Sequence, residues 1–216
     1  MFVPAHFRED RLEILHQALR QAGLLTLVTL GEDGLEANPL PMVLEPSEGE
    51  KGVLYGHLSR SNPQWRRFAR AIPALVIAAG PDCYVSPSWY PSKGRTGKVV
   101  PTWNYVAVHA YGRLDVFEDA EALLAVVGKL TDRHEQRRSR PWTVAEAPAD
   151  YLRAQLGGIV GIRLSIDRLE GKWKLSQNRS AGDRQGVIDG LREGGGERER
   201  QVAGRMIEGS SGEVGG

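Results

Sequence analysis

Cysteine is nearly absent from this chain, which has one thiol, Cys83, among 216 residues. A single cysteine excludes both a disulfide within the chain and a zinc site built from several cysteines. The formal net charge of +1 excludes an overall electrostatic attraction to nucleic acid or membranes, although a local basic patch can still exist. The sequence also lacks a signal peptide and any run of roughly 18 apolar residues that could span a membrane. These absences favour a cytoplasmic protein.

Several familiar catalytic and nucleotide-binding motifs are also missing. No G-x-G-x-x-G stands between a strand and a helix, and no G-x-x-x-x-G-K-[ST] is present, which excludes the usual dinucleotide and P-loop sites. The G-x-S-x-G elbow of serine hydrolases is absent. The histidines show no H-x-H or H-E-x-x-H spacing, so we expect no metal site.

The residues that are present predict one globular domain followed by a tail. Charged residues make up 25% and hydrophobic residues 41%, both typical of a folded chain with a single core. We expect a domain over residues 1–190 and a flexible tail, rich in glycine and charge, over 191–216. Hydrophobic periodicity predicts helices over 10–22, 61–70, 119–134, 148–156 and 196–207, and strands over 24–30, 35–44, 52–58, 73–80, 82–86, 105–116, 158–171 and 172–178.

The clearest strand signal lies between residues 105 and 116. Apolar or small residues occupy the even positions from Val106 to Val116, and mostly polar or aromatic residues occupy the odd positions. Pro39 and Pro41 place the second strand at a sheet edge or in a bulge, because proline cannot donate to a β-ladder. Seven or eight strands with a few helices predict a mainly β (α+β) domain, built as a barrel with peripheral helices.

Three polar segments are candidates for a ligand site. Ser59, Arg60 and Ser61 stand where a strand turns into a helix, which suits a phosphate group; an ordinary helix cap with a solvated arginine is the alternative. The aromatic cluster around Trp103 in 84–105 suits a flat anionic ligand or a partner chain, or simply covers a barrel end. The polar run 177–179 after a strand offers amides to a ligand, or forms a turn.

These three segments, in this order, resemble the PaiB family. They read YGHLSRSNPQW, YVSPSWYPSK followed by GKVVPTWNYVAVHAYG, and LGGIVGIRLSIDRLEGKWKLSQNR. The resemblance covers about residues 1–190. It implies the split β-barrel fold of the flavin-binding, pyridoxamine phosphate oxidase-like superfamily, with peripheral helices, and a homodimer that binds flavin mononucleotide (FMN) at the subunit interface.

The resemblance also implies which residues contact FMN. The phosphate is expected at the turn from the third strand into the following helix, the isoalloxazine ring along the second strand, and further contacts from a partner subunit and from the segment after the last strand. The residues at these places are Asn38, Met42, His57, Ser59, Arg60, Asn62, Trp103, Asn104, Gln177 and Arg179.

Members of the family are described as negative transcriptional regulators, and a regulatory role is therefore our first functional hypothesis. Alternatives are a flavin-dependent oxidoreductase acting on a small acceptor, and a haem-handling split barrel that would use His57 and His109. Whether the protein is an enzyme is left open. The basic run 132–140 is the best candidate for a DNA contact, but no helix-turn-helix pattern accompanies it.

Overall fold

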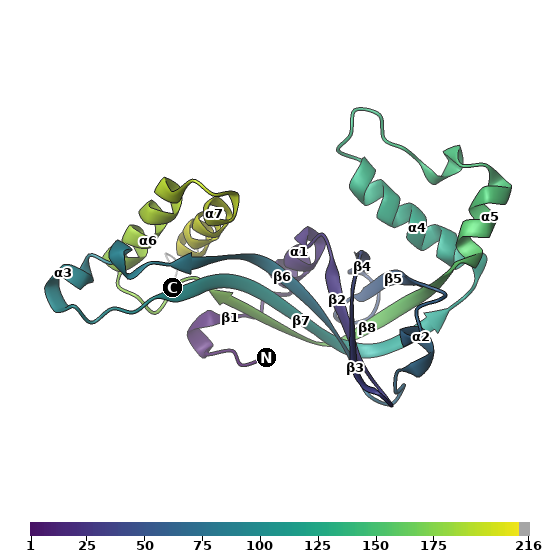
Figure 1. Cartoon of the computed structure of the whole chain (residues 1–216), viewed down its shortest axis with the longest axis horizontal. Helices are drawn as coiled ribbons and strands as arrows, with labels where there is room; N and C mark the ends of the chain where they lie inside the picture. Colours follow the sequence, from purple (N-terminus) through teal and green to yellow (C-terminus); the bar gives the residue numbers. More distant parts are fainter. Residues whose placement is uncertain (212–216) are drawn as a thin grey trace. The chain divides into compact units, whose positions relative to one another are not determined.

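The computed structural model describes residues 1–211 and divides into two compact units (Figure 1). Unit 1 comprises Met1–Asp10, Ala79–Val108 and the chain from Glu170 onward, and unit 2 comprises Arg11–Ala78 and His109–Leu169. The strands are β1 (Arg8–Glu9), β2 (Leu25–Gly31), β3 (Gly34–Leu40), β4 (Met42–Glu45), β5 (Val53–Ser59), β6 (Ala74–Val85), β7 (Thr102–Phe117) and β8 (Ile159–Lys174). The α-helices are α1 (Leu12–Gln21), α2 (Gln64–Arg67), α3 (Ser92–Thr96), α4 (Ala120–Glu135), α5 (Ala149–Gly157), α6 (Ala181–Gly194) and α7 (Glu197–Ser211), and the 3₁₀ turns are η1 (Ala5–Phe7), η2 (Pro87–Trp89) and η3 (Val144–Glu146).

The strands form one sheet in the order β3-β2-β6-β7-β8-β5-β4, with β1 paired to β8. Antiparallel pairing joins β2 to β3 and to β6, and joins β5 to β4 and to β8. The long strands β6, β7 and β8 run through both units. Within the described residues, the architecture is therefore a mostly antiparallel sheet with helices around it, as the strand count predicts.

Two prolines lie at the edge of the sheet in unit 2. Pro39 lies in β3, which pairs only with β2 in the hydrogen-bonded order, so the expected edge position is confirmed. The strand that we expected to continue to residue 44 is interrupted at Pro41 and becomes two strands, β3 and β4. Strands β3 and β4 stand at the two ends of the strand order of the sheet. Strand β3 also contacts β5, the neighbour of β4. The sheet of unit 2 therefore curls back on itself, as a barrel requires.

The buried face of unit 2 is apolar and is closed by α1 and α4. Leu15 and Leu19 of α1 and Leu123, Val126 and Leu130 of α4 are buried, and α4 contacts α5, β4 and β5. Both helices were predicted, and their buried residues recur at helical spacing.

Arg133 fastens the end of α4 to the rest of unit 2. Its guanidinium donates to the main-chain oxygens of Met42 (2.7 Å), Ala22 (3.0 Å) and Arg20. Arg133 therefore serves the fold of unit 2, and the basic run 132–140 has one cation fewer to offer to a nucleic acid.

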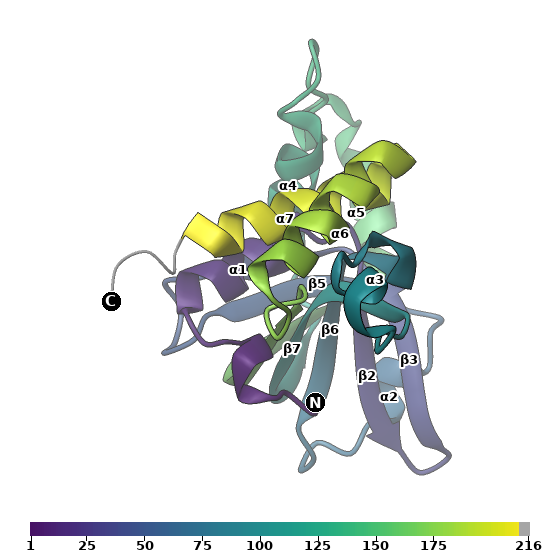
Figure 2. The ribbon, with the colours of Figure 1, turned by 90° about the vertical axis from the view of Figure 1, so that its left-hand side faces the viewer.

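Unit 1 has its own core, which the two C-terminal helices complete. Figure 2 shows α6 and α7 side by side over the ends of β6 and β7. The cluster of buried residues comprises Cys83, Val85, Tyr90, Val106, Leu175, Val187, Ile188, Leu191, Val202, Ala203 and Met206. Within the residues described, no helix is long and apolar enough to cross a membrane.

The chain beyond residue 190 differs from the flexible tail that its composition predicts. The expected boundary falls inside α6, and α7 continues to Ser211. Leu191 of α6 and Val202 and Met206 of α7 are fully buried, because the few apolar residues of these helices pack into the core of unit 1. Residues 212–216 of the expected tail lie outside the described residues.

Three other elements differ in length from their predictions. The expected strands 73–80 and 82–86 form one strand, β6, and the expected pair 158–171 and 172–178 forms one long strand, β8, without a return. The expected helix 61–70 shortens to the four residues of α2. Phe68 leaves α2 in an extended conformation and is buried, so tertiary packing overrides the helical pattern there.

We expect the thiol of Cys83 to react slowly in the folded protein. It is buried in the core of unit 1, and burial together with the carboxylates of Glu199 and Asp82 raises its pKa to about 12. Since the thiolate is the reactive form, the thiol reagent DTNB at pH 8 should modify Cys83 roughly a hundredfold more slowly in native than in guanidine-unfolded protein. Comparable rates in the two states would show that the core of unit 1 opens readily.

Candidate functional site

The junction between β5 and α2 in unit 2 carries several polar side chains. The hydroxyl groups of Ser59 and Ser61 lie 2.8 Å apart, and the main-chain N–H of Ser61 also donates to Ser59 Oγ at 3.3 Å. Asn62 Oδ1 accepts from the main-chain N–H of Gln64 at 2.9 Å, which is the expected capping contact. The structure thus brings Ser59, Arg60 and Asn62 together in one tight turn. Because α2 has only four residues, charge at this turn must come from side chains more than from a helix dipole.

Arg60 is the cation of this junction, and it already has partners. Its Nε donates to Gly157 O at 2.8 Å and its Nη2 to Ile159 O at 3.2 Å, while Nη1 forms an ion pair with Glu118. The side chains of Arg60 and Glu118 remain 36% and 53% exposed, so water and anions can compete for this ion pair. Sequence reasoning identified Arg60 but missed Glu118, since the contact spans 58 residues.

His57 lies on β5, two residues before Ser59 and on the same face of the strand. Its Nδ1 is buried, and no hydrogen-bond partner for it exists among the residues that the structure describes. Burial lowers the pKa of His57, so the ring is neutral at pH 7 and one ring nitrogen carries a proton. A buried nitrogen without a hydrogen bond lowers the stability of the fold by about 1–3 kcal/mol. A ligand hydroxyl or phosphate oxygen that forms this hydrogen bond would remove the penalty.

Asn38 and Met42 lie near the sheet edge expected to carry the flavin ring. Asn38 Nδ2 donates to Gln64 Oε1 at 2.9 Å, and the buried amide of Gln64 donates in turn to Thr29 Oγ1 and Glu36 O. The side chain of Met42 is buried, 1% exposed, in the core of unit 2. Gln64 was missed by sequence reasoning, although its place in the first turn after Pro63 was a usable signal.

The four remaining candidates all belong to unit 1. Asn104 is fully buried and exchanges two hydrogen bonds with Ser176, at 3.0 and 3.1 Å. Gln177 folds back onto its own chain, accepting from Leu175 N and donating to Trp173 O. These two amides therefore stabilise the end of β8 and its connection to β7.

Of these four residues Trp103 is exposed, and Arg179 is half-buried. Trp103 is 52% exposed, and its ring meets Tyr84 in an edge-to-face contact with 6.4 Å between centroids. The guanidinium of Arg179 lies 4.9 Å from the ring centroid of Tyr90. An exposed aromatic pair on two neighbouring strands is a surface that a partner chain can cover.

Comparison with known proteins places the chain in a family. Residues 1–168 match the family model described as "Putative FMN-binding domain". The chain is 31% identical over 203 residues to the Protease synthase and sporulation protein PAI 2 of Bacillus subtilis, covering 94% of this chain and 95% of that protein. It is 35% identical over 226 residues to an uncharacterized protein of Emericella nidulans, covering 88% and 90%.

Solved structures support the fold. The FAD and heme binding protein from Mycobacterium smegmatis superimposes with a TM-score of 0.58 at 20% sequence identity, covering 88% of this chain and 80% of that one. The split-barrel fold with peripheral helices that the resemblance implies is confirmed. The polar junction after β5 and the unpaired nitrogen of His57 fit the hydroxyl and phosphate groups of a flavin nucleotide. The chain therefore belongs to the PaiB-type family of split-barrel proteins, whose cofactor is FMN.

Proposed function

We propose that the protein is a cytoplasmic, homodimeric regulator of the PaiB type that holds the phosphate of FMN at the junction of β5 and α2. Ser59, Arg60 and Asn62 supply the hydroxyls, the cation and the amide there, and His57 supplies a ring nitrogen from the same strand face. The observation that carries the proposal is the buried Nδ1 of His57, which has no partner among the described residues. Bound FMN would supply redox chemistry of its own, while the chain binds and orients it.

The six expected FMN contacts outside the phosphate site have other roles in this proposal. Asn38 is assigned to the strand edge of the isoalloxazine ring, and Met42 supports that edge from the core of unit 2, where its side chain is buried. Trp103 is exposed and Arg179 is half-buried, and both are assigned to the surface that meets a second copy of the chain. Asn104 and Gln177 act by holding the strand ends that present them, because their amides are already hydrogen-bonded within unit 1.

The regulatory part of the proposal rests on the relative from Bacillus subtilis, whose name refers to protease synthesis and sporulation. Direct DNA binding has little support, since the net charge is +1 and Arg133 of the basic run holds main-chain oxygens of unit 2. We therefore favour a regulator that responds to flavin and acts through a partner contact.

Two substitutions with opposite expected effects test the phosphate site. His57→Phe removes the ring nitrogen and should weaken FMN binding about tenfold, as loss of one hydrogen bond to a charged group does. Glu118→Gln removes the carboxylate that competes for Arg60 and should tighten FMN binding about fivefold. Titration of each protein with FMN, followed by flavin fluorescence, measures both effects.

The controls separate binding from folding. His134→Phe changes a histidine on α4 and should leave FMN affinity unaltered, and thermal unfolding should show that all variants remain folded. Light scattering on the same samples should give twice the mass of one chain. If neither His57→Phe nor Glu118→Gln changes FMN affinity, the phosphate lies elsewhere; a monomeric mass would remove the dimer from the proposal.

A further inference from the structure

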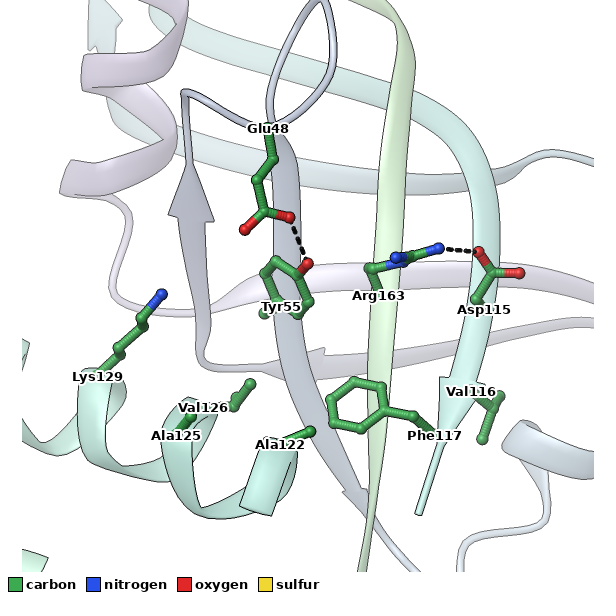
Figure 3. Close-up of a pocket in the computed structure, with 10 residues that line it drawn as sticks. All are labelled: Glu48, Tyr55, Asp115, Val116, Phe117, Ala122, Ala125, Val126, Lys129 and Arg163. Carbon is green, nitrogen blue, oxygen red and sulfur yellow. Dashed lines mark hydrogen bonds and ion pairs between the residues drawn. The ribbon is translucent and has the colours of Figure 1, made fainter. Parts of the chain in front are cut away.

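A pocket of about 440 Å³ lies in unit 2 between α4 and the strands β5, β7 and β8 (Figure 3). None of its lining residues belongs to the set that we assign to FMN. The lining residues are Glu48, Tyr55, Asp115, Val116, Phe117, Ala122, Ala125, Val126, Lys129 and Arg163. The volume lies within the range of about 300–1,000 Å³ that is usual for sites of small molecules.

One side of the pocket is a row of polar side chains that crosses the strands. Tyr55 and Arg163 are directly opposite each other in the β5–β8 register. The hydroxyl of Tyr55 donates to Glu48 Oε2 at 2.5 Å, and Arg163 Nη2 donates to Asp115 Oδ2 at 3.0 Å. Figure 3 shows the row running from Glu48 to Asp115. Burial and the Glu48 carboxylate raise the pKa of Tyr55, so its hydroxyl stays protonated and the row stays intact at neutral pH.

The opposite side of the pocket is apolar and contains an aromatic corner. Figure 3 shows Phe117, Ala122, Ala125 and Val126 on this side, below the polar row. The rings of Phe117 and Tyr55 are 6.4 Å apart between centroids at an interplanar angle of 73°. Two rings set nearly at right angles offer one face and one edge to a third ring.

Gly161 of β8 makes room for this arrangement. A Cβ at Gly161 would lie 2.3 Å from the ring of Phe117, so any larger residue would push that ring out of its place. The position of the aromatic wall is therefore set by the backbone of β8.

The ionisable groups that line the pocket all have partners. Its two acidic residues, Glu48 and Asp115, balance its two basic residues, Lys129 and Arg163. Lys129 pairs with Glu45 at 2.6 Å, and Arg163 pairs with Asp115. Glu48 accepts the hydrogen bond from the Tyr55 hydroxyl. A charged ligand would have to displace one of these partners, whereas an uncharged ligand leaves them all in place.

We propose that this pocket binds a small, uncharged, planar aromatic molecule, with its ring against Phe117 and the apolar side of α4 and its polar edge on the Glu48–Tyr55–Arg163 row. The occupied pocket would join α4 to β5, the strand that also carries His57 and Ser59. A ligand here is thus placed to influence the flavin site without overlapping it.

Binding of 5-fluoroindole, followed by ¹⁹F NMR, tests the proposal. The probe is uncharged, planar and carries one N–H donor, and we expect saturable binding to the full-length protein. Ala122→Phe should weaken this binding at least about tenfold. Ala122 is half-buried at the pocket wall, so the larger phenylalanine ring would occupy the space that the probe needs. The matched control is Leu124→Phe, on the same helix and outside the lining, which should bind the probe like wild type.

A second measurement needs no variant. In the amide NMR spectrum of wild type, 5-fluoroindole should cause its largest shifts at Tyr55, Phe117 and Val126, and the shifts should persist when FMN is saturating. Equal binding to Ala122→Phe, or the largest shifts elsewhere, would overturn the site. Tighter binding of the anion 4-fluorobenzoate would overturn the uncharged class, and displacement by FMN would show that the pocket belongs to the flavin site.

Discussion

Gly112→Ala is expected to destabilise unit 2 by about 3 kcal/mol or more, a large part of the 5–15 kcal/mol that usually stabilises a domain. Gly112 is buried in β7, and a Cβ added there would lie 1.9 Å from the main-chain oxygen of Ser165 in β8. That distance is far inside van der Waals contact, and the obstacle is backbone, so no side-chain rotation can relieve it. The two strands would have to separate, with loss of hydrogen bonds between them.

Denaturant unfolding followed by circular dichroism measures this effect. Gly128→Ala is the matched control, because Gly128 lies in α4 with no atom within 4 Å of the added Cβ. Alanine there should stabilise the protein by up to about 1 kcal/mol, through helix propensity alone. Equal unfolding midpoints for Gly112→Ala and wild type would mean that β7 and β8 are not held as closely as the structure shows.

Gly112 also illustrates what sequence patterns predict well. The alternation from Val106 to Val116 assigned the buried face of β7 correctly: Val106, Val108, Ala110, Gly112 and Leu114 are all buried. Period-two patterning depends only on neighbouring residues, so it can be recognised without knowing the fold. The same pattern does not reveal that one of these small residues is required by the approach of β8.

Long-range contacts explain most of what the sequence patterns missed. Arg60 was identified from its place after a strand, but its partners Glu118 and Gly157 are 58 and 97 residues away. Asn104 was identified as a candidate FMN contact, and its hydrogen bonds to Ser176, 72 residues away, could not be foreseen. Short motifs identify polar groups of the right chemistry, whereas the partners that use those groups are set by tertiary structure.

The C-terminal helices show the limit of composition as a guide. Gly and charged residues predicted a flexible tail after residue 190, yet Leu191, Val202 and Met206 are buried in the core of unit 1. Helix α6 also carries a buried carboxylate, Asp183, which binds Ser92 at the start of α3. A polar segment can be ordered when a few of its side chains meet specific partners. We therefore expect a large effect on stability when the contact between Asp183 and Ser92 is removed.

Asp183→Ala is expected to destabilise unit 1 by about 3 kcal/mol. The Asp183 carboxylate is 6% exposed and accepts from the main-chain N–H of Ser92 at 3.0 Å and from its hydroxyl at 2.9 Å. Hydrogen bonds to a charged group contribute about 1.5–3 kcal/mol, and the substitution leaves both donors of Ser92 without this acceptor. Asp189→Ala on the same helix is the matched control, because its carboxylate is exposed and, within residues 1–211, accepts from Gln185 alone. Its effect should stay within about 0.5 kcal/mol.

The pH dependence of this difference identifies its cause. The backbone hydrogen bond from Ser92 is the main reason why the pKa of Asp183 lies below its usual value of 3.8. A lowered pKa means that the stabilisation is fully present above the pKa of the unfolded state and is lost as the pH falls through the pKa of the folded state. Unfolding free energies of wild type and Asp183→Ala should therefore differ by a constant amount between pH 5 and pH 8 and converge below about pH 4. A difference that persists undiminished at pH 3 would mean that the charged carboxylate is not what holds the start of α3 to α6.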